Sequence, residues 1–363
     1  MPDHGVRLQL YIGPTKPTPA PYEVMDALRS VEVTNKDQDF DGFQISFSLG
    51  KGSVEYGLLA GGMLDPDRRV VIAVNFGTQP EVLIDGIIEK HTVRPSNRPG
   101  ESTLYIYGKD ISSKLHREDK DKQHPNQSDS EIVTQLINAY SSLGVKAKVT
   151  KTDDVPAQSD RIPSQQCSDL SFIRQRAQHN GYVFYLEPTA VGESTAYWGP
   201  DNRSGEVQPP LTLNMGPDTN VDDPPNVDFD AMGPVEPDVT FVDPITKRTI
   251  HVPLPASLHP SLAKQAAAAL RKTLSRNTAN LNFVQALLKA LSTVSESSDA
   301  VTINNEVDAV RYGRVLRARR LVKVRGVGQS YDGTFYVKEV VHSIRRGEYK
   351  QRFKLIREGR GAA

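Results

Sequence analysis

Apolar and polar residues alternate in short stretches along the first third of the chain. Between residues 43 and 49 the odd positions are apolar and the even positions are polar, which places the apolar set on one face of a strand. Residues 6–12, 69–76, 82–91 and 102–107 indicate further strands, separated by clusters of turn-forming residues. Short strands joined by polar turns are typical of an antiparallel barrel or sandwich, so we predict a first β-barrel domain over residues 1–113.

Two units of a helix followed by a strand come next, after a polar linker at residues 114–127. The first helix begins at Ser128, where Glu131 completes a capping box. The second begins at Ser168 and ends at Gly181, since Gly commonly terminates a helix. We therefore predict an α+β module over residues 114–200.

The chain then becomes rich in Pro and acidic residues. Eight acidic residues and no basic one lie between Asp218 and Asp243. We predict an extended, ordered arm over residues 201–256, anchored by apolar residues that could form strands. Residues 260–275 are Ala-rich with helical spacing, and residues 280–291 have a similar pattern, so a helical insertion is predicted over residues 257–298.

The last part of the chain alternates again. Residues 321–327 read as a strand, and residues 334–342 and 349–357 read as the two strands of a hairpin. We predict that residues 299–363 complete a second barrel interrupted by the helices. The predicted fold class is mainly β with an α+β insert, containing two barrel-like β domains.

Charge and cysteine usage narrow the class of protein. Lys+Arg and Asp+Glu both number 44, so no bulk field steers the chain toward nucleic acid or anionic membrane. The single cysteine, Cys167, has no neighbouring base and is interpreted as a small buried residue. No signal-peptide pattern and no apolar run of membrane-spanning length is visible, so we expect synthesis and assembly in the cytoplasm.

No pattern predicts catalysis. The Gly residues form no phosphate-binding loop, and the eight His are scattered without metal-ligand spacing. The acidic residues of the arm lack the spacing of a calcium loop and are interpreted as a candidate acidic interface: Asp222, Asp223, Asp228 and Asp230. We predict no catalytic residue, no cofactor and no metal.

A basic stretch begins near residue 311. Seven Lys and Arg lie between Arg311 and Arg325, and on strands alternate positions would gather part of this charge on one face. Docking to an acidic arm or a neighbouring subunit is favoured, and nucleic-acid binding with interleaved aromatics is the alternative. The candidate basic interface consists of Arg311, Arg314, Arg317, Arg319 and Arg320.

Two segments carry a resemblance to a known family. Residues 168–186, SDLSFIRQRAQHNGYVFYL, resemble the helix-Gly-strand segment of late control protein D in contractile phage tails, which type VI secretion valine-glycine repeat spike proteins share. Residues 331–344, YDGTFYVKEVVHSI, with residues 349–357, resemble the closing barrel hairpin of that family. The residues we expect to specify this fold are Phe172, Ile173, Gly181, Phe184, Gly333, Tyr336, Val337 and Val340.

The resemblance implies a structural role without catalysis. Members of the family are homotrimeric baseplate hubs, in which two similar barrels per subunit present six near-equivalent faces to a hexameric inner tube. The implied partners are a second and third copy of the chain, an inner tube protein, other baseplate subunits and a spike. This chain lacks a valine-glycine repeat region, so the spike would be a separate protein. A cell-wall hydrolase of the tail tip and a nucleic-acid-binding β protein are the alternative functions.

Overall fold

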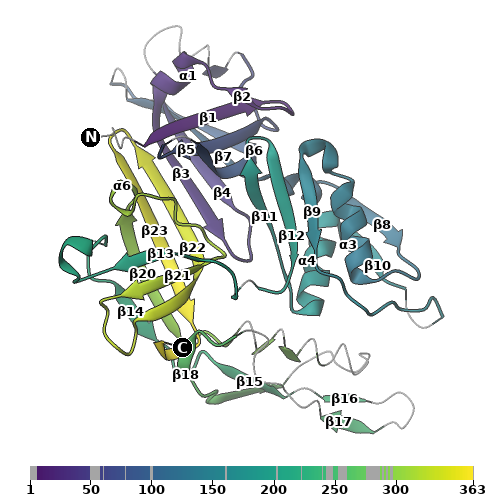
Figure 1. Cartoon of the computed structure of the whole chain (residues 1–363). Helices are drawn as coiled ribbons and strands as arrows, with labels where there is room; N and C mark the ends of the chain where they lie inside the picture. The colour runs from purple at the N-terminus through teal and green to yellow at the C-terminus, as the bar shows by residue number, and fades with distance from the viewer. Residues whose placement is uncertain are drawn as a thin grey trace.

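The fold was examined in a computed structural model of the chain. The structure describes residues 6–49, 58, 59, 61–77, 79–98, 101–159, 162–201, 203–221, 223–238, 240–242, 248–251, 260–274, 287, 290, 291, 293, 294 and 297–362. A 13-stranded sheet dominates it, and the predicted fold class, mainly β with an α+β insert, is confirmed. Figure 1 shows the first strands of the chain at the top, the C-terminal strands at the left and the two longest helices, residues 129–138 and 169–180, at the right.

The N-terminal half of this sheet is the first β module. It is antiparallel, with the strand order β3-β4-β7-β6-β5-β1-β2, and the short helix α1 (Tyr22–Ala27) lies between β2 and β3. Its strands are β1 (Arg7–Gly13), β2 (Thr18–Pro19), β3 (Leu28–Lys36), β4 (Gly42–Leu49), β5 (Arg69–Asn75), β6 (Pro80–Arg94) and β7 (Ser102–Asp110).

The six longer strands of this half all contribute side chains to one core, as expected for a barrel-like unit. The predicted alternation in β4 places Phe43, Ile45 and Phe47 inside. Gly86 and Gly108 lie against the ring of Phe43, because a Cβ added at either position would come within 2.8 Å and 2.3 Å of that ring. Only glycine therefore fits beneath this aromatic side chain.

The second β module surrounds a separate core. Its strand order is β13-β21-β22-β23-β20-β14, and the single helical turn α6 follows β20. Its elements are β13 (Val207–Thr212), β14 (Asn226–Phe229), β20 (Val301–Asp308), α6 (Ala309–Tyr312), β21 (Leu321–Arg325), β22 (Gly333–Arg345) and β23 (Glu348–Arg357). The first two of these strands lie within the stretch predicted as an arm.

Strand β22 joins the two modules into one sheet. It pairs with β23 along its length and with β3 over residues 339–345, where His342 lies opposite Val33. The tip of the β22–β23 hairpin then enters the first module, because Ile344 and Tyr349 are buried in its core. The two modules are therefore not independent folding units.

The α+β module packs on the first β module. Its elements are η1 (Ile111–His116), β8 (Asp119–Gln123), α3 (Asp129–Asn138), η2 (Ser141–Leu143), β9 (Val145–Val149), β10 (Ser164–Ser168), α4 (Asp169–Asn180), β11 (Val183–Ala190) and β12 (Glu193–Gly199). Strands β11, β12 and β9 form one sheet and β10 and β8 another. Ile87 of β6 lies in the same apolar cluster as both long helices.

Both predicted helix starts are confirmed. Ser128 and Glu131 exchange the two hydrogen bonds of a capping box, and Ser168 caps α4, which ends at Gly181 with φ +67°. The linker predicted at residues 114–127 is wrong, because η1 and β8 occupy most of it. Strand β8 pairs with β10, a contact that its polar composition does not reveal.

The remaining segments form small two-stranded sheets below the second module (Figure 1). Their strands are β15 (Val235–Asp238), β16 (Thr240–Val242), β17 (Thr249–His251), β18 (Ala263–Ala266), β19 (Arg271–Leu274) and the C-terminal β24 (Gly359–Ala362), whereas the short turn η3 (Gly216–Asp218) lies between β13 and β14. The helix predicted at residues 260–275 is wrong: β18 pairs with β24 and β19 with β15. Tertiary pairing here overrides the helix propensity of alanine. Most of the helix predicted at residues 280–291 lies outside the described residues.

Candidate functional site

The three modules meet at a short segment before β21. This segment, residues 317–320, will be called the clamp. Arg319 has φ +64°, a left-handed conformation that is uncommon for a side chain of this size. Two backbone hydrogen bonds hold it, because Arg319 N donates to Val337 O over 2.8 Å and Val337 N donates to Arg320 O over 2.9 Å.

Arg319 is the buried centre of the clamp. Its Nη2 donates to Asp41 Oδ1 over 2.5 Å, its Nη1 donates to the carbonyl of Leu186 in β11 over 3.5 Å, and its guanidinium lies 4.4 Å from the centre of the Tyr185 ring. Burial opposes its charge, but the Asp41 carboxylate outweighs this cost and raises the pKa of the guanidinium. A single side chain thus connects all three modules.

Both carboxylate oxygens of Asp41, the partner of Arg319, accept hydrogen bonds. Its carboxylate also accepts hydrogen bonds from Asn35 Nδ2 at 3.0 Å and from Lys36 N at 2.9 Å. Its own backbone N–H donates to Asp110 Oδ2 over 2.8 Å. Burial and the nearby Asp41 charge raise the pKa of Asp110 to about 6. These contacts satisfy a buried charge that would otherwise be strongly unfavourable.

The neighbouring arginines of the clamp reach the same two modules at the surface. Arg317 donates to Val82 O over 2.5 Å and to Glu81 Oε2 over 3.1 Å, both at the start of β6. Arg320 donates to Glu187 Oε1 over 2.6 Å in β11. Because these two pairs are partly exposed, each contributes less than the buried one.

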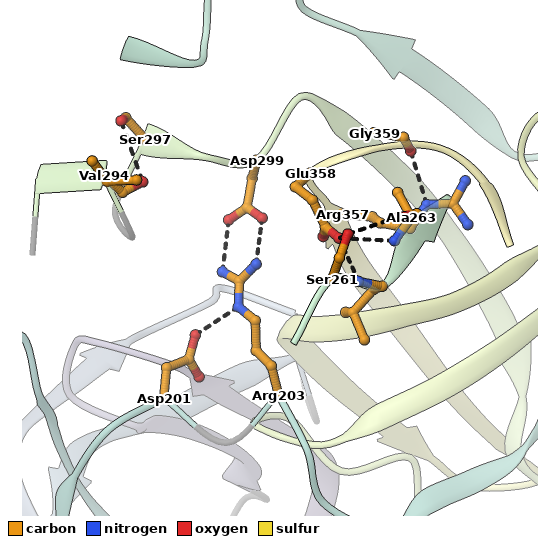
Figure 2. A network of polar contacts seen from close by, with 11 residues as sticks. Asp201, Arg203, Ser261, Ala263, Val294, Ser297, Asp299, Arg357, Glu358 and Gly359 are labelled. Carbon is orange, nitrogen blue, oxygen red and sulfur yellow. Dashed lines mark hydrogen bonds and ion pairs between the residues drawn. The ribbon is translucent and has the colours of Figure 1, made fainter. Parts of the chain in front are cut away.

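A second buried arginine, Arg203, lies between Asp201 and Asp299 (Figure 2). Arg203 makes a two-bond ion pair with Asp299, at 2.7 Å and 2.9 Å, and its Nε donates to Asp201 Oδ2 over 2.9 Å. Its guanidinium lies 5.2 Å from the centre of the Tyr336 ring. Burial opposes its charge, yet Asp299 and Asp201 raise the pKa of Arg203. This pair ties the end of the α+β module to the start of β20.

Asp37 completes the charged cluster. Burial raises its pKa to about 6, the charges of Asp201 and Asp299 act in the same direction, and Lys338 and Arg319 oppose them. Near this junction, carboxylates are matched by arginines and by backbone donors. The arrangement can hold three modules in one fixed geometry, but it presents no nucleophile paired with a base.

Glu358 anchors the segment that precedes β18. Its Oε1 accepts hydrogen bonds from Ser261 Oγ at 2.6 Å, from Ala263 N at 2.8 Å and from Leu262 N (Figure 2). Next to it, the buried Arg357 donates to the carbonyls of Gly359, Asp332 and Ser330. Glu358 therefore holds the start of β18, together with the residues just before it, next to the end of β23.

In the part of the chain that the structure describes, no three His, Cys, Asp or Glu side chains are grouped so that they could hold a metal ion. None of the helices seen in that part has the length and apolar character needed to cross a bilayer. Cys167 is half-buried, and burial raises the pKa of its thiol.

The residues expected to specify the fold lie in the α+β module and in β22. Phe172, Ile173 and Phe184 are buried in the α+β module, and Gly181 terminates α4. Tyr336, Val337 and Val340 are buried in β22, and Gly333 starts that strand with φ +131°. Their role in specifying this fold stays a prediction.

The candidate basic interface is divided by the structure. Arg317, Arg319 and Arg320 form ion pairs with carboxylates of the same chain. Docking of these three residues to a neighbouring subunit stays a prediction. Arg311 and Arg314 are exposed at and just after α6. Their contact with a partner stays a prediction.

The candidate acidic interface lies around β14. Asp223, Asp228 and Asp230 are exposed, whereas Asp222 lies outside the described residues. Asp228 Oδ2 accepts a hydrogen bond from Asn226, and Asp230 Oδ1 accepts one from Met232 N. The contact of these acidic residues with a partner stays a prediction.

Comparisons with known proteins address the fold. A tail protein of Neisseria meningitidis aligns with 98% of this chain and 97% of its own length, at a TM-score of 0.68 and 13% identity. A 43 kDa tail protein of prophage MuSo2 from Shewanella oneidensis aligns with 98% of this chain and 99% of its own length, at a TM-score of 0.63 and 12% identity. This chain has a phage-tail protein fold.

The phage-tail fold extends to a secretion-system protein. The Escherichia coli c3393 protein, described as a type VI secretion component similar to T4 tail proteins gp27 and gp5, aligns over 99% of this chain and 80% of its own length, with a TM-score of 0.56 and 12% identity. A family model for the Alg8 N-terminal domain matches residues 48–196, less than half of the chain. No curated protein matches the sequence.

The residues that hold this phage-tail fold together were mostly missed from the sequence. Asp41, Asp110, Arg203 and Asp299 carry no local pattern that sets them apart from surface charges. The run of arginines at the clamp was visible, but only its buried partners reveal its purpose.

Proposed function

We propose that this chain is the structural hub subunit of a contractile, phage-tail-like injection machine. Three copies form a ring that adapts a hexameric inner tube to a separate trimeric spike, and the subunit carries out no covalent chemistry. The ring resides in the baseplate of the particle, with the other baseplate subunits as neighbours.

One observation carries this proposal: two β modules, each with its own core, are fused into a single sheet through β3 and β22. Three copies of a chain can offer six similar contacts only if each copy contains two similar units. The buried clamp supports this role, because it fixes the geometry between the units. Full-length similarity in fold to two tail proteins also supports it.

A nucleic-acid-binding function receives less support from the same geometry. Three of the five arginines proposed for such a face bind carboxylates within the chain. These ion pairs reduce the positive charge that the face from Arg311 to Arg357 could offer to phosphates.

Mass measurement and electron microscopy of the purified protein test the proposal. We expect a particle of three times the 40.1 kDa chain mass, with six lobes around a common axis. A protein that stays monomeric at high concentration, and forms no ring when tube protein is added, would contradict it. Turnover of peptidoglycan that is lost on changing one Asp or Glu would contradict the absence of catalysis.

A further inference from the structure

The outer face of the large sheet is open and polar where the two modules join. Its side chains are those that alternate with the core residues, such as Glu32 and Thr34 of β3, which alternate with the buried Val31 and Val33. Strands β22 and β4 flank β3 on either side, so this face runs from one module into the other. Antiparallel sheets commonly leave one face in contact with water or a partner.

Two hollows lie on this face and share Glu32 and Thr34. The first, of about 530 Å³, lies over β3, β4 and β7, and its charged lining consists of Glu32, Asp39, Glu89 and Lys109. The second, of about 340 Å³, lies over β3, β22 and β23, and is lined by Glu339, Arg352 and Lys354. Because they share β3, the two hollows form one groove across the junction, which will be called the seam groove.

The seam groove has an excess of acidic side chains over the first hollow and two basic side chains, Arg352 and Lys354, on its β23 side. In the first hollow, Lys109 is paired with Glu89 at 3.3 Å and Asp39 lies 3.9 Å from Lys36. Glu32 has no ion pair among the residues that the structure describes, and its cross-strand neighbours Gln44 and Ser343 are neutral. At the other end, Arg352 and Lys354 also have no ion pair within the described ranges, although Lys354 lies opposite Glu339 across the strands.

This charge distribution favours a polypeptide over a nucleic acid as the ligand of the groove. A nucleic acid would bring phosphates against Glu32, Asp39 and Glu89, which is unfavourable. An extended polypeptide can instead carry a cation at one end and an anion at the other. Neighbouring strands lie about 4.8 Å apart, so three to four strand steps span about 14–19 Å, which about four to six extended residues cover.

We infer that the seam groove binds an extended segment of another protein. The segment carries a basic side chain over the first hollow and an acidic side chain about four to six residues away, over Arg352 and Lys354. The groove lies on a single copy of the chain. Its occupation therefore does not depend on the proposed ring, and either conclusion can fail without the other.

Peptide binding to the intact protein tests the inference. The probes are fluorescein-labelled decapeptides of alternating Thr and Val, with Lys and Glu five positions apart in both orders, and a control peptide with Gln at both charged positions. We expect one charged peptide to bind at least about ten-fold more tightly than the control, as judged by fluorescence anisotropy. Equal binding of all three peptides would overturn the inference.

Two charge-reversal variants distinguish peptide binding in the groove from unspecific attraction between peptide and protein charges. Glu32→Lys should weaken the charged peptide about ten-fold, whereas Glu206→Lys makes the same charge change at an exposed position outside the groove and should leave binding unchanged. A peptide with Glu in place of Lys should bind E32K more tightly than it binds the unaltered protein. Equal weakening by E32K and E206K, with unchanged thermal melting of both, would refute the groove.

Discussion

Arg319 and Asp41 form a buried ion pair with a separation of 2.5 Å between Nη2 and Oδ1, although 278 positions separate them in the chain. Both side chains are less than a tenth exposed. The pair joins the segment before β21 to the loop between β3 and β4, so it closes a contact between the beginning and the end of the polypeptide.

Replacing either side chain of this ion pair should lower the free energy of unfolding. Asp41→Asn or Arg319→Met leaves the opposite charge buried without compensation, so we expect a loss of about 3–5 kcal/mol in the free energy of unfolding. Urea denaturation followed by tryptophan fluorescence measures it. Arg314→Met at an exposed position is the matched control, with an expected change below about 0.5 kcal/mol. If both buried variants lose less than about 1 kcal/mol in the free energy of unfolding, the ion pair does not stabilise the fold.

Replacing Glu358 should expose the backbone of residues 261–266 to exchange without unfolding the rest of the protein. Glu358→Ala removes the acceptor for Ser261 Oγ and for two backbone N–H groups. We expect faster amide exchange over residues 261–266, measured by hydrogen-exchange mass spectrometry, with little change in β20 to β23. Glu206→Ala serves as the control. Unchanged exchange at Leu262 and Ala263 would contradict the anchoring role.

His342 should make the protein less stable in acid. Burial lowers its pKa to about 3, and the nearby Arg317 acts in the same direction. The unfolded chain therefore binds a proton below about pH 6.5 that the folded chain does not accept until about pH 3. The stability associated with the neutral His342 side chain is fully present above pH 6.5 and is lost as the pH falls toward 3, by up to about 5 kcal/mol.

A pair of variants isolates this effect. The Nδ1 atom of His342 lies 3.0 Å from the Tyr349 hydroxyl, so the double variant H342F/Y349F removes the titrating group without leaving that hydroxyl unpaired. Its stability should vary less with pH between 6.5 and 4 than that of Tyr349→Phe alone, as measured by denaturation at each pH. Equal slopes in the two variants would assign the acid sensitivity to other groups.

Asp37 should have the opposite pH dependence. Burial raises its pKa to about 6, above the value of 3.8 in the unfolded chain. Asp37 therefore contributes to the free energy of unfolding below about pH 3.8, and this contribution is lost as the pH rises to 6. Asp37→Asn should stabilise the protein at pH 7 by up to about 3 kcal/mol and have little effect at pH 4. Asp39→Asn is the exposed control, and destabilisation of D37N at pH 7 would contradict the assignment.

The features that could be predicted from the sequence are local. The capping box at Ser128 and Glu131, the helix ending at Gly181 and the closing hairpin each depend on residues within a few positions of one another. Their physical cause is backbone hydrogen bonding in one turn or between adjacent strands. Periodicity and cap residues report these interactions directly.

The features that could not be predicted depend on distant contacts. Residues 260–275 have the composition of a helix, but Ala263 and Ala266 pair with Ala362 and Gly359 at the far end of the chain. Similarly, Arg319 resembles its neighbour Arg320 in sequence, and only the fold decides which one is buried. Charge counts along a chain cannot distinguish a surface arginine from one that holds the interior together.

The insertion of Ile344 and Tyr349 into the N-terminal core has a consequence for biosynthesis. A ribosome releases the first 110 residues long before it makes these two side chains, so the nascent N-terminal strands cannot complete their apolar packing on their own. Chains that stop before residue 344 would lack both side chains, and the interior of their N-terminal strands would stay incomplete.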